Sequence, residues 1–391
     1  MADAFELLDG LTRPERRTVR TLLVRTTAAS GDPDARLELP DLLATARVDA
    51  LPAAAAMHRV SGSVLRGLDG VAGVPDDVRR QLAAVKSRSA IRHMVVTGAL
   101  SQAGRALDAG GLAWAVMKGP VVAAHLYPDV GDRSYADLDL LVARRDFARA
   151  MQLLEELGYE NLTHDWALAE QMLAGEVGLR SSAVHVDLHW HIHYAVEDRR
   201  PFGFQPDAMV DRARRVDVSR VAVPTLDPVD TLITLAFHAA RSDGHRLMWL
   251  KDVERAVAVD EPDLDELVRR CRAYGCGPPV GLILGRARNL LGADIPDEIV
   301  RATLPRSLRE ADRAISRVEH PVQLHERDTI TRAFTRSVKS STVASFVAVP
   351  DRGVRSLRRR LRPHQVNESD DVDEKRSYLD AVAHSTEGRS P

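Results

Sequence analysis

Two short stretches of the sequence combine acidic residues with hydrophobic, strand-forming residues. In the stretch Asp137-Leu-Asp-Leu-Leu-Val142, Asp137 and Asp139 are two positions apart, so a strand would project both carboxylates from one face. Two carboxylates on one face repel each other, and a cation between them relieves the repulsion. Mg²⁺ suits such a site because it binds carboxylate oxygens and keeps positions for water and substrate phosphates; Mn²⁺ is the alternative ion.

The second stretch, residues 184–193, alternates apolar residues with one aspartate and four histidines. This period of two predicts a strand with one buried face and one polar face. If the strand lies beside residues 137–142, Asp187 supplies a third carboxylate, which would complete a two-metal site for phosphoryl transfer. His189 follows Asp187 on the same face and is the histidine expected nearest to this site. The four imidazoles also allow a zinc site as an alternative.

The surrounding sequence predicts the elements that position these residues. Helices are expected up to residue 111, including one from Asp76 to about Gly110 with apolar residues from Val78 to Val95 along one face. Short strands are expected at 114–117, 215–218 and 221–223, and a helix is expected from 147 to 157. After Asp227, which has the features of a helix N-cap, helical patterns continue to about residue 347.

Taken together, these motifs resemble a family of bacterial nucleotidyltransferases within the polymerase-beta-like superfamily. The resemblance rests on the strand that ends in Lys118-Gly119, on Arg133 before the paired aspartates, and on the later Asp-Leu-His-Trp190. Segments 235–238 and 247–252 resemble the helical half of that family, so His238 and Asp252 are candidates for the pocket. A hydrogen-bonded pair that joins two helices is the alternative for these two residues.

The resemblance implies an α+β fold in which a small mixed β-sheet is flanked by helices. It also implies metal-dependent transfer of a nucleoside monophosphate from an NTP to an unidentified hydroxyl acceptor. By position, Asp137 and Asp139 would hold metal, Asp187 would hold metal or act as base, and the nucleotide would contact three further residues. These are Lys118, Gly119 and Arg133.

One departure from the superfamily leaves other functions open. Pro120 follows Gly119 where the superfamily has a hydroxyl-bearing or second glycine residue, so the turn lacks a serine that would help to bind phosphate. An inactive nucleotide-binding module with the same fold is therefore one alternative. A zinc-dependent hydrolase built on residues 185–193 is a second, and a toxin-like transferase that acts on tRNA is a third.

Composition limits the protein class. The 54 basic and 56 acidic residues give a net charge of −2, which argues against a globally basic nucleic-acid-binding protein. Two cysteines cannot build a disulfide framework, and no apolar run of about 18 residues or signal-like N-terminus is present, so a cytoplasmic location is expected. The oligomeric state is open.

Four regions are predicted: helical residues 1–111, a nucleotidyltransferase core at 112–225, a helical domain at 226–350, and a final segment at 351–391. The final segment begins with six arginines between Arg352 and Arg362, a candidate for weak contact with an anionic surface such as lipid headgroups or RNA. The polar residues 367–391 are predicted to form a disordered acidic tail.

Overall fold

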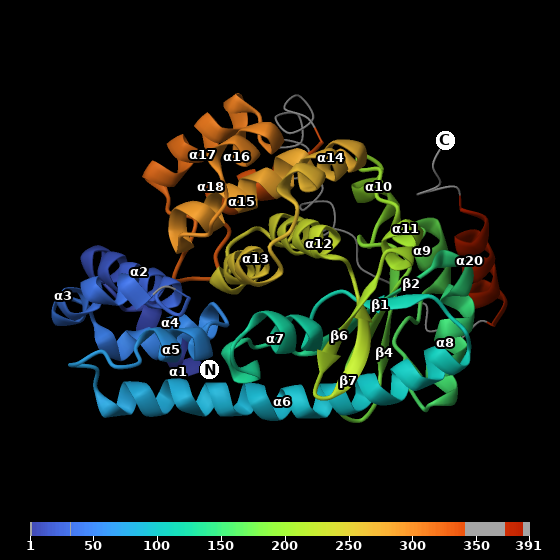
Figure 1. The fold of residues 1–391 in the computed structure, drawn as a ribbon, viewed down its shortest axis with the longest axis horizontal. Helices are drawn as coiled ribbons and strands as arrows, with labels where there is room; N and C mark the ends of the chain where they lie inside the picture. Colours follow the sequence, from blue (N-terminus) through green and yellow to red (C-terminus); the bar gives the residue numbers. More distant parts are fainter. Residues whose placement is uncertain (1, 32, 341–371, 386–391) are drawn as a thin grey trace.

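The computed structural model describes residues 2–31, 33–340 and 372–385. Its N-terminal part consists of helices packed around a shared apolar core, above one long helix that runs on beneath the β-sheet (Figure 1). These elements are α1 (Ala2–Asp9), α2 (Arg13–Ala28), η1 (Pro33–Glu38), α3 (Leu39–Thr45), η2 (Val48–Ala50), α4 (Leu51–Met57), α5 (Ser61–Gly67) and the long α6 (Asp76–Ala109).

The long helix α6 contributes to two cores. Near its start Val78 and Leu82 are buried among the N-terminal helices, whereas Leu100 and Leu107 are buried beneath the sheet. The predicted apolar face from Val78 to Val95 is wrong in its second half, because Ile91 and Val95 are exposed. Over 34 residues the buried face of a helix changes with its neighbours, so a single stripe cannot describe it.

The sheet has seven strands in the order β3-β4-β5-β2-β1-β7-β6. Strands β2 and β5 are parallel, as are β1 and β7, whereas β1–β2, β4–β5, β3–β4 and β6–β7 are antiparallel, so the predicted mixed sheet is confirmed. The strands are β1 (Trp114–Val116), β2 (Asp137–Val142), β3 (Glu160–Asn161), β4 (Glu176–Arg180), β5 (His185–His189), β6 (Arg214–Val218) and β7 (Val221–Thr225).

The two faces of the central strands differ as the alternation of residues predicts. Leu138, Leu140, Val186 and Leu188 point from one face into a core shared with α6 and α8 (Phe147–Glu156). The opposite face therefore carries the acidic and imidazole side chains of β2 and β5, which share a register. Two helices from the second half of the chain contact residues next to these strands, through His238 with Lys118 and through Asp252 with Arg133.

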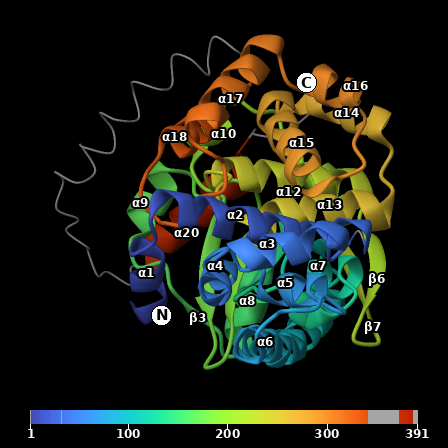
Figure 2. The ribbon, with the colours of Figure 1, turned by 90° about the vertical axis from the view of Figure 1, so that its left-hand side faces the viewer.

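The other helices connect the strands or form the C-terminal half, seen from the side of the N-terminal helices in Figure 2. Asp227 caps α12 as predicted, accepting a hydrogen bond from the backbone N–H of Asp230 at 2.8 Å. No helix in the described ranges is long and apolar enough to cross a membrane. The connecting elements are α7 (Pro120–Leu126), η3 (Val130–Asp132), η4 (Arg144–Asp146), α9 (Trp166–Gln171), α10 (Val196–Arg199) and α11 (Pro206–Asp211). The C-terminal half comprises α12 (Pro228–Arg241), α13 (Leu247–Asp260), α14 (Leu264–Tyr274), α15 (Gly277–Leu291), α16 (Asp297–Thr303), α17 (Arg306–Val318) and α18 (Ile330–Ser337).

A buried histidine joins the N-terminal helices to the C-terminal half. Nδ1 of His58 accepts the backbone N–H of Leu247 at 3.2 Å, so Nε2–H of the neutral ring donates to the carbonyl of Gln323 at 2.8 Å. Burial lowers the pKa of His58 to about 4. Protonation would place an N–H on Nδ1 against another N–H, so this contact requires the neutral ring.

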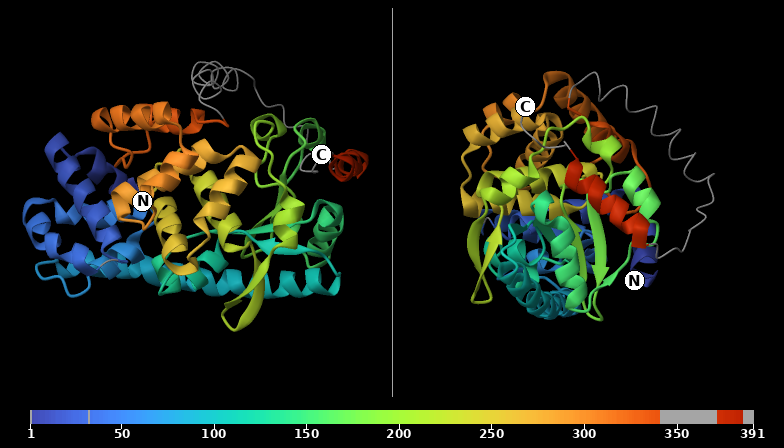
Figure 3. Two further views of the ribbon diagram at one scale, coloured as in Figure 1. Left: turned by 45° about the horizontal axis from the view of Figure 1, so that its top comes forward. Right: turned by 90° about the vertical axis from the view of Figure 1, so that its right-hand side faces the viewer.

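The final segment is not disordered throughout, which corrects the prediction for residues 367–391. Helix α20 (Val372–His384) packs against α9 and α8 at the side of the sheet (Figure 3). Tyr378 is fully buried among Trp166 and Phe147, and its hydroxyl donates to the carbonyl of Ala174 at 2.6 Å. Apolar residues at helical spacing therefore outweigh the polar composition. The arginine-rich residues 352–362 lie outside the described residues.

Candidate metal and nucleotide site

The parallel pairing of β2 and β5 brings the predicted carboxylates together. Asp139 pairs in register with Asp187, and Asp137 pairs with His185. One ligand atom each from Asp139, Asp187 and His189 lie within 4.8 Å of one another. Among the described residues this is the only group of three or more acidic, histidine or cysteine side chains with such spacing. Asp137 lies on the same face of β2 but is not part of this group.

His189 lies between two carboxylates in a buried position. Its Nδ1 lies 2.9 Å from Oε2 of Glu176 on β4, and its Nε2 lies 3.4 Å from Oδ1 of Asp139. Neither ring nitrogen makes a hydrogen bond of standard geometry within the described part of the chain. A buried nitrogen that faces a carboxylate without a hydrogen bond fits a divalent cation between the two, so the side chains present suit a metal ion.

Lys118 supplies a positive charge to the same group. The backbone N–H of Met117 donates to the carbonyl of Asp139 at 3.1 Å, which places the following residue next to that aspartate. Nζ of Lys118 lies 2.9 Å from Oδ1 of Asp139 and 3.5 Å from Nδ1 of His238. The lysine therefore neutralises the carboxylate that a metal ion would bind.

These neighbours change the protonation of the group. Burial alone would raise the pKa of Asp139, but the charges of Lys118 and His189 hold it far below its usual value. For Asp187, burial together with the Asp139 and Glu176 carboxylates raises the pKa to about 6. Burial would lower the pKa of His189, yet the same two carboxylates raise it to about 10. The site thus holds one firmly ionised aspartate and one that binds a proton more readily.

The Lys-Gly-Pro turn is built around Gly119. Its backbone has φ of 59° and ψ of −119°, and a Cβ here would lie 2.9 Å from the carbonyl oxygen of Asp137. Both facts require glycine whatever the turn binds. Pro120 begins helix α7, as predicted.

Arg133 is buried in an ion pair. Its Nε and Nη2 donate to the two carboxylate oxygens of Asp252 at 2.8 and 2.9 Å, and Nη1 donates to the carbonyl of Gly119 at 3.3 Å. The hydroxyl of Tyr127 also donates to Asp252, at 2.7 Å. Arg133 thus links the turn at Gly119 to α13, and its predicted contact with nucleotide remains a prediction.

His238 and Asp252 have separate partners. His238 on α12 faces Lys118, whereas Asp252 on α13 holds Arg133. Burial and the Lys118 charge lower the pKa of His238 to about 3, so the ring is neutral at pH 7. Of the two predicted pocket residues, His238 is the one whose side chain contacts Lys118, the lysine paired with Asp139.

The four histidines of residues 185–193 do not converge. Strand β5 ends at His189, which corrects the prediction of a strand to residue 193. The ring of His191 packs edge-on against Trp190 and Phe204, and that of His193 packs against Phe237. Neither ring belongs to the group formed by Asp139, Asp187 and His189.

Glu176 is the site residue that the sequence did not indicate. Strand β4 pairs antiparallel with β5, so Glu176 lies opposite His189 and Gly178 lies opposite Asp187. The alternation in Glu176-Val-Gly-Leu-Arg180 is a usable signal for a strand, but only the sheet order reveals which residue it faces.

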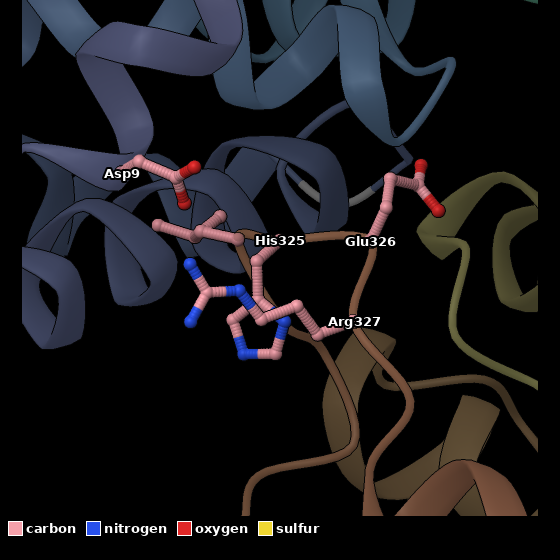
Figure 4. A pocket seen from close by; sticks show the side chains of 5 residues that line it. Asp9, His325, Glu326 and Arg327 are labelled. Atoms are coloured by element: carbon pink, nitrogen blue, oxygen red, sulfur yellow. The ribbon is translucent and has the colours of Figure 1, made fainter.

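Two small cavities lie away from these carboxylates. One of about 330 Å³ is lined by Asp9, Leu324, His325, Glu326 and Arg327, next to the N-terminal helices (Figure 4). The other, of about 190 Å³, lies between α2 and α15. Neither contains a residue of the Asp139, Asp187 and His189 group.

Comparison with known proteins identifies the family of the chain. A family model described as uncharacterised nucleotidyltransferase matches residues 44–292, well over half of the chain. The chain belongs to this nucleotidyltransferase family. The resemblance seen in the sequence is therefore confirmed, and the matched range contains Lys118, Asp139, Asp187 and His189.

Other comparisons add little to the family assignment. No curated protein matches the chain. The crystal structure of an antigenic nucleotidyltransferase-like protein from Paracoccidioides brasiliensis is similar over 52% of this chain and 92% of that chain. With 16% sequence identity and a TM-score of 0.32, this likeness carries no further argument.

Proposed function

We propose that this nucleotidyltransferase-family protein transfers a nucleoside monophosphate from an NTP to a hydroxyl acceptor, with a divalent metal ion held at β2 and β5. The observation that carries the proposal is the approach of Asp139, Asp187 and His189 ligand atoms to within 4.8 Å of one another. Their position inside the family-matched range supports assigning the chemistry to this group.

The reaction that fits these side chains is an in-line displacement. The acceptor hydroxyl oxygen attacks the α-phosphorus, a new P–O bond forms, and the bond to the pyrophosphate oxygen breaks. A bound divalent metal would lower the charge on the phosphate oxygens. Asp187, with its raised pKa, is suited to accept the hydroxyl proton, and Asp139 stays ionised to hold the metal.

Three residues around the carboxylate group have separate proposed roles in binding the nucleotide, the turn and the metal ion. Lys118 lies next to Asp139 and is placed to bind a triphosphate oxygen as a point charge once a metal ion takes over the carboxylate. Arg133 holds the turn at Gly119 through its carbonyl, so we assign it to positioning that turn. Asp137, at the start of β2, is proposed as a further metal ligand on the same face.

Calorimetry with the four NTPs tests the proposal directly. Each NTP is titrated with Mg²⁺ or Mn²⁺ into wild type, Asp139→Asn and, as a matched control, Asp265→Asn. The control changes the same position of a second Asp-Leu-Asp tripeptide, in the exposed first turn of α14. Binding that depends on metal and is lost only in Asp139→Asn supports the site.

Turnover is then measured as pyrophosphate release with sugar, protein and RNA acceptors. Asp139→Asn is expected to lose at least two orders of magnitude in rate while Asp265→Asn keeps it. Equal rates in the two variants would contradict the assignment of Asp139.

An inactive nucleotide-binding module remains the second candidate. Two observations favour it: the turn has Pro120 in place of a hydroxyl-bearing residue, and Lys118 is paired with Asp139. Metal-dependent NTP binding without pyrophosphate release across all the acceptors would favour this candidate over the transferase.

A further inference from the structure

The donor atoms of the site include nitrogen as well as oxygen, and this mixture affects which metal ion the site prefers. Asp139 and Asp187 offer carboxylate oxygens, whereas His189 offers an imidazole nitrogen. Mg²⁺ favours oxygen ligands, whereas imidazole is a good ligand for first-row transition ions. A mixed set therefore favours an ion that accepts both kinds of donor.

The backbone holds His189 and Glu176 in a fixed relation. They are register partners in β4 and β5, and the carbonyl of Gly175 accepts the N–H groups of both Trp190 and His191 at 3.0 Å. The chain on either side of the pair is thus tied together within a few residues. Side chains on adjacent, hydrogen-bonded strands keep their orientation better than side chains on loops.

Glu176 determines which nitrogen of the His189 ring can bind a metal ion. Its carboxylate lies 2.9 Å from Nδ1 and stabilises the proton there, so Nε2, which faces Asp139 at 3.4 Å, is the nitrogen that gives up its proton when a metal ion binds. A carboxylate that holds the outer nitrogen of a metal-binding histidine fixes the tautomer and the direction of the ring. Glu176 is in this sense a positioning residue.

We infer that His189 is a direct metal ligand through Nε2, positioned by Glu176, and that the site selects a transition ion of the Mn²⁺ or Co²⁺ kind over Mg²⁺. This inference deepens the proposed function, because it names the metal class at the same site. It does not depend on transfer activity, since the ligand can be observed on the protein with metal alone.

Electron spin echo measurements on the Mn²⁺-loaded protein test the ligand. The wild type is expected to show modulation from a bound ¹⁴N nucleus, and His189→Asn is expected to lose it. His185→Asn is the matched control, because His185 lies on the same face of β5, 3.5 Å from Asp187, but outside the three-residue group. Modulation that survives in His189→Asn, or that disappears in His185→Asn, would overturn the inference.

Affinities for Mn²⁺, Co²⁺ and Mg²⁺, measured by calorimetry without nucleotide, test selectivity and the role of Glu176. Loss of the outer carboxylate in Glu176→Gln is expected to weaken Mn²⁺ and Co²⁺ binding by about 10- to 100-fold while the ¹⁴N modulation persists. In His189→Asn the preference for Mn²⁺ over Mg²⁺ should fall at least tenfold. An unchanged preference in His189→Asn would refute selection by the histidine.

The metal inference and the transferase proposal can be refuted separately. If the ¹⁴N ligand is present but no NTP is bound or turned over, the metal inference stands and the transferase proposal fails. If the protein releases pyrophosphate but neither its metal preference nor its ¹⁴N modulation depends on His189, the transferase proposal stands and the inference about the metal fails.

Discussion

Replacing Lys118 with methionine should change metal binding and nucleotide binding in opposite directions. The ammonium group lies 2.9 Å from Asp139, and both side chains are largely buried, with 16% and 5% of their surface exposed. A metal ion that binds Asp139 must displace this ammonium group. Lys118→Met keeps the length of the side chain but removes the competing charge.

The size of the effect follows from the contact that is lost. An interaction with a charged partner contributes about 1.5 to 3 kcal/mol, and about 1.4 kcal/mol corresponds to a tenfold change in affinity. The metal dissociation constant of Lys118→Met, measured without nucleotide, should therefore fall about 10- to 100-fold. The affinity for NTP in the presence of saturating metal should fall by a similar factor, because the phosphate oxygens lose their positive partner.

Calorimetry on three proteins checks this prediction. Lys375→Met is the matched control, since Lys375 forms an ion pair with Glu155 on the far side of the sheet at 2.7 Å and should leave both affinities unchanged. Lys118→Arg keeps the charge and should not gain metal affinity. If Lys118→Met binds metal no more tightly than the wild type, Lys118 does not compete for Asp139 and the reasoning is refuted.

Three further predictions concern the scaffold and are checked by urea unfolding. His58→Gln should lower the free energy of unfolding at pH 7. The difference from the wild type should shrink by up to about 3 kcal/mol towards pH 4, because His58 has a pKa near 4 in the folded wild type and 6.5 in the unfolded chain, so the wild type loses stability over this range. A difference that does not change with pH would contradict this. Asp252→Asn should lower the free energy of unfolding by about 3 to 5 kcal/mol, since it leaves the buried Arg133 charge unpaired. A decrease below about 1 kcal/mol would show that this ion pair contributes little to stability. Tyr378→Ala should lower the free energy of unfolding by about 3 to 5 kcal/mol, because it removes a fully buried ring. Unchanged stability would show that the packing of α20 does not stabilise the fold.

The strands and the acidic group were predictable because local patterns determine them. The alternation around Asp139 and Asp187 reflects one apolar and one polar face, and this pattern survives whatever order the strands take in the sheet. Proline and aspartate at helix starts were equally informative, as at Pro120 and Asp227. Each of these signals lies within a few residues.

Features that depend on distant neighbours could not be predicted from local patterns. The role of Glu176 depends on β4 lying beside β5, and the pairing of Arg133 with Asp252 joins residues 119 positions apart. Residues 372–384 have a polar composition, yet Tyr378 and Val382 find an apolar surface between α8 and α9. In the same way, Ile91 and Val95 belong to a helical stripe that nothing in the described chain covers at that point.

The charges around Asp139 explain how one site could be both stable without metal and ready to bind it. Asp139, Asp187 and Glu176 would repel one another in a partly buried space, and Lys118 together with His189 offsets that repulsion. Lys118 and His189 contact the carboxylates that a metal ion would bind, and Lys118 can also bind a triphosphate. Ligand binding therefore replaces existing ion pairs with new ones and does not add unpaired buried charge. Removing Lys118 or His189 should therefore affect ligand affinity more strongly than removing a cation remote from the site, such as Lys375, which pairs with Glu155.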